Sequence, residues 1–559
     1  MSFRRWFVRY RAMTLLLIIL TLIVCPDAAR GDDNVRCHVV PAHEPSAAEK
    51  AYLAGNTSQA EALYREALSK SPHDTTLIAG LVRSLLREQK VEDASSTIGA
   101  EMPLAPNSVP LLTAFAEVEY RQGKIAEAAV TADQAFRIDP CNPRLYLIRA
   151  RILRLNSMYA SERRALGIAH SLDPSDIDIR RTWLGTLPLT QRIDEQKKFL
   201  ASANGMDPEE RTRVESGLVN LVSWASNPDQ ICHLVSTASS SELPLVPIFS
   251  KGNSRYIESW GLHVFFNNNE AGLAVDTGAS GLFINRAIAE RAGLKPIGRV
   301  QISGVGDQGP AGGYAAHVDS IRIGSLEFRD CIVKVIDRTD VLNIDGVIGT
   351  DVFSSYLVTL DYPMRKFLLS PLPPRPTDTS GTPATLNMES GDPVASLSSV
   401  GPGSSAQSTG PQDRYISPTM KDYSPFFRSG HYIILPTLLN GKTQRLFMVD
   451  SGAFSSSISP EAARAVTKVR GGDLGAVKGM SGEVAKVSFS DSVIFRFAGI
   501  QQQNNDLVSF DTSSLSKGAG FEISGFLGST VLRQLTISID YRDGLIRFDY
   551  DPRRGNHFY

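Results

Sequence analysis

Small, apolar and proline positions between residues 41 and 226 recur with a period of 34 residues, which predicts an array of paired helices. Prolines mark the period, because proline cannot continue a helix but readily begins one. These prolines are Pro72, Pro106, Pro140, Pro174 and Pro208. Two alanine series fall where paired helices would approach closely, and they comprise Ala67, Ala135, Ala169 and Ala203, and Ala60, Ala94 and Ala128. We expect an all-α solenoid over 41–226, closed by a helix over 211–224.

The turn inside each helix pair is expected at positions 55, 89, 123 and 157. Gly55 and Gly123 suit such a turn, whereas Gln89 and Ser157 occupy the equivalent positions. Glu101 likewise interrupts the first alanine series. These departures make single repeats irregular without breaking the period.

From about residue 245 the pattern changes to short β-rich runs between glycine turns, and this region is duplicated. One copy contains Leu273-Ala-Val-Asp276-Thr277-Gly278-Ala279, and the other contains Phe447-Met-Val-Asp450-Ser451-Gly452-Ala453. Further landmarks keep the same order in both copies. They are Ile284 and Ile458, the helix caps Asn285 and Ser459, the triplets Val347-Ile348-Gly349 and Phe526-Leu527-Gly528, and the pairs Asp361-Tyr362 and Asp540-Tyr541. The chain is therefore expected to be multidomain, with an all-β domain of two pseudo-symmetric halves, 245–372 and 426–555.

The segment between the halves, residues 373–425, is rich in Pro, Ser, Thr and Gly. Such a stretch has too little apolar surface to form a core, so a disordered linker is expected. A linker of this length lets the halves meet face to face, and it is also a candidate processing site.

The N-terminal segment, residues 1–31, has a basic stretch followed by an apolar run from Met13 to Cys25. This pattern is typical of a secretory signal and is short for a membrane span. An uncleaved anchor is the alternative, and Arg4-Arg5 weakly matches a twin-arginine signal. We expect export to a periplasmic, cell-envelope or secreted location, with membrane contact only through this segment if it stays uncleaved.

Composition, charge and the motifs that are absent from the sequence argue against several classes of function. The chain is 42% hydrophobic and 21% charged, and its formal net charge of −1 gives no electrostatic footprint for nucleic acid. Cys37, Cys141, Cys232 and Cys331 lack C-x-x-C spacing, so we expect no metal site and up to two disulfides with all three pairings open. Neither H-E-x-x-H nor G-x-S-x-G occurs. Gly304-Val-Gly306-Asp-Gln-Gly309 precedes no helix pattern, so no dinucleotide or other cofactor is expected.

The helical array resembles the tetratricopeptide-repeat family in its period and in its alanine and proline positions. This resemblance implies a concave groove that binds peptides or protein partners, with a rigid spacer as the alternative. The duplicated region resembles aspartic peptidases of the retropepsin and pepsin type, in the D-[ST]-G triplets, the glycine-rich flap segments and the apolar-apolar-Gly motifs. It implies a catalytic pair, Asp276 and Asp450.

Two carboxylates in one small space cannot both ionise, so the pair supplies a base for water and an acid for the peptide carbonyl. Gly278 and Gly452 allow the backbone to approach these carboxylates. The resemblance implies that the Thr277 and Ser451 hydroxyls link the halves. It also makes Gly304, Gly306, Gly479 and Gly482 the flap candidates, although both flap segments match the family only loosely.

The expected function is an exported aspartic endopeptidase, with peptide or protein substrates and with protein partners docked in the repeat groove. A non-catalytic envelope scaffold that binds peptides is the rival from another class. A dimer that forms mixed sites between two chains is the rival arrangement.

Overall fold

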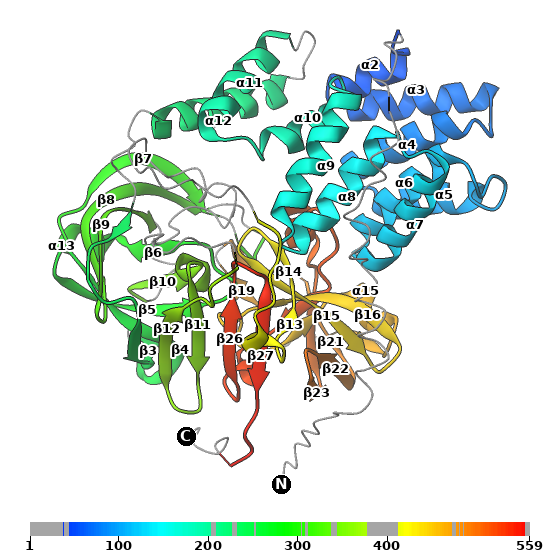
Figure 1. Ribbon diagram of the computed structural model, residues 1–559. Coiled ribbons are helices and arrows are strands. Elements are labelled where there is room, and N and C mark those ends of the chain that lie inside the picture. Colours follow the sequence, from blue (N-terminus) through cyan, green and yellow to red (C-terminus); the bar gives the residue numbers. More distant parts are fainter. Residues whose placement is uncertain are drawn as a thin grey trace.

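The computed structural model describes residues 37, 44–202, 208–225, 232–250, 253–302, 304–307, 311–336, 344–376, 412–471, 477–479, 481–484 and 486–553. The predicted signal or anchor segment lies outside them. The chain has a multidomain layout, in which a helical array precedes a β-rich region (Figure 1). No helix within the described ranges combines the length and apolar character that crossing a membrane requires.

The array consists of antiparallel helices in the predicted register. Its helices are α2 (Ala47–Leu53), α3 (Thr57–Lys70), α4 (Thr75–Arg87), α5 (Val91–Glu101), α6 (Val109–Arg121), α7 (Ile125–Ile138), α8 (Pro143–Leu155), α9 (Tyr159–Leu172), α10 (Ile177–Leu184), α11 (Leu189–Ser202) and α12 (Pro208–Ala225). Ala60, Ala94, Ala128, Ala135 and Ala169 are buried where helices cross, because a methyl group permits close approach. The predicted closing helix lies within α12, where the Gln196 side chain of α11 donates to the Val214 carbonyl at 3.4 Å.

All four predicted turn positions adopt a left-handed backbone. The φ angles are 86° at Gly55, 64° at Gln89, 70° at Gly123 and 57° at Ser157. This conformation is free for glycine and costs a side-chain-bearing residue roughly 1–2 kcal/mol. Gln89 and Ser157 therefore keep the turn of the repeat without its preferred residue.

The first half, predicted over 245–372, is built on one sheet that also takes in β1 ahead of residue 245. The strand order of this sheet is β1-β9-β6-β10-β5-β4-β8-β7, with β3 paired to β4. Its elements are β1 (His233–Leu234), β3 (Val246–Ser250), β4 (Asn253–Phe266), β5 (Asn269–Asp276), β6 (Leu282–Asn285), α13 (Arg286–Arg291), β7 (Lys295–Ile302), β8 (Ala311–Ile323), β9 (Leu326–Ile336), β10 (Gly346–Gly349) and η2 (Thr350–Phe353). The parallel pair β5·β10 sets Asp276 opposite Gly349.

The second half, 426–555, repeats this plan with the order β18-β21-β24-β17-β25-β16-β15-β22-β23, with β14 paired to β15. Its elements are β14 (Phe427–Ser429), β15 (Tyr432–Leu439), β16 (Thr443–Val449), β17 (Ser457–Ile458), α15 (Pro460–Arg464), β18 (Val469–Gly471), β19 (Lys478–Gly479), β20 (Gly482–Glu483), β21 (Val487–Ser490), β22 (Val493–Phe497), β23 (Ile500–Asn504), β24 (Leu507–Phe510), α16 (Ser513–Ala519), β25 (Gly525–Leu527) and α17 (Ser529–Leu532). The parallel pair β16·β25 corresponds to β5·β10. Asn285 and Ser459 cap α13 and α15 as the sequence predicts.

A shared sheet joins the halves in the order β13-β27-β26-β11-β12-β2. Its strands are β2 (Ser241–Pro244), β11 (Tyr356–Asp361), β12 (Lys366–Pro371), β13 (Ser424–Pro425), β26 (Thr536–Asp540) and β27 (Leu545–Asp549). At its centre, β11 of the first half pairs antiparallel with β26 of the second half, so that Leu357 faces Asp540. These central strands end at the two Asp-Tyr landmarks of the sequence.

The predicted linker, 373–425, is too long at its C-terminal end. Residues 412–425 contain η3 (Pro418–Met420) and β13, and they are held by the buried carboxylate of Asp543. The Tyr415 amide donates to Asp543 at 2.8 Å, and the Arg375 side chain bonds to both Asp543 and Gln412. The two ends of the segment therefore lie side by side, and residues 377–411 lie outside the described residues.

Two disulfides resolve the open cysteine pairing, Cys37–Cys141 and Cys232–Cys331. The first attaches residue 37 to the segment before α8, and the second attaches the segment before β1 to β9.

Removing the second disulfide should destabilise the first half. Cys232→Ala with Cys331→Ala releases a loop closed over a sequence separation of 99 residues, and the free energy of unfolding should fall by about 2 to 5 kcal/mol. Denaturant unfolding under non-reducing conditions measures the loss. The matched control replaces Cys37 and Cys141 by alanine. An unchanged unfolding free energy in the Cys232/Cys331 variant would contradict the prediction.

Candidate active site

Asp276 and Asp450 come from the ends of equivalent central strands and meet between the halves. Asp276 ends β5, and Asp450 follows β16 directly. The Gly452 amide lies 3.1 Å from Asp276 Oδ1 and 2.9 Å from Asp450 Oδ1, so a single N–H group reaches both carboxylates. The structure thus brings together, from one chain, the two aspartates that the sequence singles out.

A reciprocal set of hydrogen bonds fixes the two loops against each other. The Thr277 hydroxyl donates to the Val449 carbonyl at 2.9 Å, and the Ser451 hydroxyl donates to the Val275 carbonyl at 3.2 Å. Each hydroxyl also accepts the backbone N–H of the other residue, at 3.0 and 2.9 Å. Both side chains are buried. The linking role that the resemblance implies for Thr277 and Ser451 matches this geometry.

Gly278 and Gly452 are required because each backbone contacts the opposite carboxylate. A Cβ at Gly278 would lie 2.6 Å from Asp450 Cγ, and one at Gly452 would lie 2.4 Å from Asp276 Oδ2. Backbone amides also donate within each half, from Gly278 to Asp276 at 2.7 Å and from Ala453 to Asp450 at 2.9 Å. Any side chain at these glycines would push the carboxylates apart.

Burial and proximity raise the pKa of both aspartates. Burial raises the pKa of Asp276, although the Gly278 and Gly452 amides oppose that effect. Burial and the charge of Asp276 raise the pKa of Asp450 well above its usual range. The pair therefore retains one proton in a pH range where ordinary carboxyls have lost theirs, as an acid–base pair needs.

The four flap candidates meet at one point, although they come from different halves. The Ser481 amide donates to the Val305 carbonyl at 2.9 Å, and the Gly304 amide donates to the Ser481 hydroxyl at 3.1 Å. A Cβ at Gly306 would lie 2.4 Å from the Ser481 carbonyl carbon, and one at Gly479 would lie 2.5 Å from the Val305 oxygen. Gly482 pairs with Gly479 in the β19·β20 hairpin. The two flap tips are thus in direct contact.

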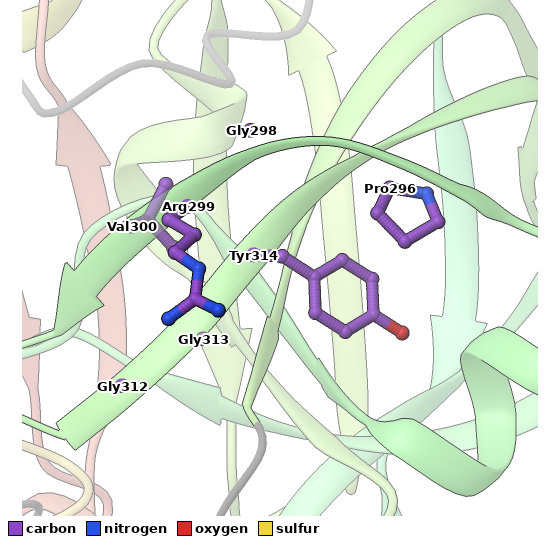
Figure 2. A pocket seen from close by; sticks show the side chains of 7 residues that line it. All are labelled: Pro296, Gly298, Arg299, Val300, Gly312, Gly313 and Tyr314. Carbon is purple, nitrogen blue, oxygen red and sulfur yellow. The ribbon is translucent and has the colours of Figure 1, made fainter.

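The strands that lead to the first flap line an open surface pocket of about 680 Å³ (Figure 2). Arg299 of β7 and Tyr314 of β8 are cross-strand partners, and their side chains lie beside the pocket. Gly298, Gly312 and Gly313 contribute no side chain to fill it. Tyr314 therefore lines an open pocket at the base of the first flap.

Two tyrosines from the Asp-Tyr landmarks bond across the halves. The Tyr541 hydroxyl of the second half lies 2.5 Å from the Thr350 hydroxyl of the first. Burial raises the pKa of Tyr362 to about 12, and this tyrosine of the first half is bonded to Ser451 of the second. The landmarks thus mark residues that make contacts with the opposite half.

Sequence reasoning missed Asp351, which is fully buried behind the loop that holds Asp276. Its carboxylate accepts the Gly281 amide at 3.0 Å, and burial raises its pKa to about 6. The available signal was its position two residues after the Val347-Ile348-Gly349 triplet. The second half has Thr530 at the corresponding place, so duplication alone could not single it out.

Two further residues near the pair were missed, and both make the halves unlike. Burial lowers the pKa of His431 to about 4, so its ring is neutral, and it bonds to the backbone of Gly278 across the halves. Phe454, four residues after Asp450, is 65% exposed, whereas Ser280 is its counterpart in the first half. Within the described ranges no group of three or more His, Cys, Asp or Glu side chains is placed to hold a metal ion.

Comparisons with known families match one segment of the helical array and one segment of the β-rich region. Residues 262–352 match the family described as aspartyl protease, and residues 51–114 match the tetratricopeptide-repeat family. No curated protein matches the chain. A solved structure of a thermophilic TPR protein from Thermus thermophilus is 20% identical, with a TM-score of 0.25, and the match covers 31% of this chain and 95% of that one. So weak a structural likeness adds nothing to the assignment from residues 51–114.

Substituting Gly452 should disturb the pair more than substituting an unconstrained glycine. Gly452→Ala places a methyl group against Asp276 and should reduce the free energy of unfolding by about 1 to 3 kcal/mol. The matched control is Gly518→Ala in α16, where a Cβ meets nothing within 4 Å. Thermal and denaturant unfolding compare the variants, and equal stabilities would contradict the tight approach at Gly452.

The raised pKa of Asp351 predicts a pH dependence of stability. The folded protein binds this proton more tightly than the unfolded chain, so the contribution is full below about pH 4 and is lost as pH rises through about 6. Asp351→Asn should therefore gain stability relative to wild type between pH 4 and pH 7, by up to about 3 kcal/mol. Unfolding curves across this range test the difference, and parallel curves would show that Asp351 does not titrate as described.

Proposed function

We propose that the chain is an aspartic endopeptidase that hydrolyses peptide bonds with a water held between Asp276 and Asp450. The observation that carries this proposal is the single Gly452 amide within hydrogen-bond distance of both carboxylates. The match of residues 262–352 to aspartyl proteases supports it. Because both aspartates belong to one chain, the proposed site does not need a second copy.

In the proposed mechanism, the ionised carboxylate takes a proton from water while the protonated one donates to the substrate carbonyl oxygen. The Gly278, Gly452 and Ala453 amides favour the ionised partner, and mutual repulsion retains the proton on the other. The touching flap tips at Val305 and Ser481 would have to part to admit a peptide and could then close over it.

The localisation and partners are proposed as well. The basic and apolar segment 1–31 supports export, and two disulfides among the described residues fit an oxidising compartment. We propose protein partners for the repeat array, since such repeats commonly mediate protein interactions.

Asp276→Asn and Asp450→Asn should each lower peptide cleavage by at least about a thousandfold, because each removes one member of the acid–base pair. Each variant is incubated with a diverse peptide library from about pH 3 to about pH 7.5. Mass spectrometry of the products then measures the loss of cleavage. In wild type, activity should fall as rising pH removes the shared proton and as falling pH protonates the second carboxylate. Since the pKa of both aspartates is raised, the active range should extend above that of ordinary carboxyls.

Asp506→Asn is the matched control, because Asp506 is an exposed aspartate between β23 and β24 that pairs with Arg470. The Asp506→Asn variant should cleave peptides as efficiently as wild type. Retained activity in either site variant would exclude the pair as catalytic. A folded wild type that cuts nothing at any pH would favour the scaffold instead.

A further inference from the structure

The repeat array is packed directly against the second half (Figure 1). The Tyr120 ring of α6 meets the Phe521 ring edge-on with centroids 5.9 Å apart. The Glu522 amide donates to the Arg121 carbonyl at 2.8 Å. A Cβ at Gly123 would lie 2.9 Å from the Glu522 carbonyl oxygen, so the turn after α6 touches the second half closely.

The array covers a surface that the first half covers with its own flap strand. In the first half, Ala274 faces Val347 in the β5·β10 pair, and these residues pack with Val300 and Ile302 of β7. In the second half, Met448 faces Phe526 in the equivalent β16·β25 pair. This second pair lies in one apolar cluster with helix residues of the array, namely Tyr120, Ile125, Ala128 and Leu155. The helices therefore replace strand packing on the Asp450 side.

The same apolar cluster extends to the proposed site. Its partly buried members include Ala453, which bonds to Asp450, and Val305, which lies at the first flap tip. Val477 and Val484 flank the second flap hairpin and belong to it too. Tyr432, whose pKa burial and the Asp450 charge raise, connects the cluster to the catalytic loop. From the array, the partly buried member is Ile152 of α8.

A buried ion network joins helices within the array. Arg144 of α8 bonds to Glu117 of α6 at 2.8 Å and to Asp178 of α10 at 3.1 Å. The Tyr52 hydroxyl of α2 donates to Asp178 at 2.5 Å, which joins helices 126 residues apart. These contacts join α2, α6, α8 and α10 of the array to one another.

We propose that α8 of the array forms part of the wall that receives a substrate side chain on the Asp450 side, and that Ile152 limits the size of the apolar side chain accepted there. The inference rests on the proposed function, because it names a specificity residue of that same site. It predicts an apolar preference at one position next to the scissile bond.

The test uses the full chain and peptides in which each residue flanking the scissile bond is varied separately among Ala, Leu and Phe. Ile152→Ala should shift the ratio of kcat/KM for Phe over Ala upward by about tenfold at one of the two positions, and Ile152→Phe should shift it downward. Ile152→Val should shift this ratio upward by less. The smaller substitution keeps the test valid if Ile152→Ala or Ile152→Phe fails to fold. The matched control is Val130→Ala and Val130→Phe, since Val130 of α7 is 70% exposed and lies outside the cluster.

A binding measurement separates the failure of this inference from the failure of the proposed function. The probe is a statine-containing peptide series with the same side-chain changes, and Kd is measured for each variant without any cleavage. Parallel shifts in Kd support the wall at Ile152 even if wild type cleaves nothing. Unchanged preferences in folded Ile152 variants, in cleavage or in binding, would overturn the inference while leaving Asp276 and Asp450 untouched. Absence of both cleavage and statine binding in folded wild type would overturn both.

Discussion

One backbone N–H group, that of Gly452, lies within hydrogen-bond distance of two carboxylates, and much of the structure serves to hold that arrangement. Two buried carboxylates repel when both are ionised, so the loops must be kept together by other contacts. The crossed Thr277 and Ser451 hydroxyls supply these contacts from inside the pair. The absence of a side chain at Gly278 and Gly452 then lets each backbone reach the opposite carboxylate.

The wider frame keeps the two loops in register. The antiparallel β11·β26 pair fixes one half against the other through backbone hydrogen bonds, which do not depend on the protonation of side chains. Tyr541 extends this frame to Thr350, beside the first loop. The helical array packs against the second half through an apolar cluster that includes Met448, Phe521 and Phe526. The halves are thus similar in plan but supported differently.

The sequence predicted the features that repeat, because repetition makes a pattern visible in one chain. The 34-residue period located even the left-handed turns at Gln89 and Ser157, and the paired triplets located Asp276 and Asp450. Features that depend on single contacts stayed hidden. Asp351, His431 and Phe454 have no matching partner in the other half, and the cysteine pairing depends on distances that only the fold defines. The end of the linker was misplaced because a buried carboxylate, Asp543, orders polar residues that composition alone suggests are disordered.

The segment between the halves is anchored at both ends, and this affects how the protein tolerates insertions and deletions there. Arg375 and Gln412 are bonded at 2.6 Å, so the chain between them leaves and returns at one place. Closing such a loop costs entropy that grows only logarithmically with its length, about 0.6 kcal/mol for each doubling. Insertions or deletions between these anchors should therefore be nearly neutral for the pairing of the halves. Sequence drift, or an inserted domain, can accumulate there while the geometry of the carboxylate pair stays fixed.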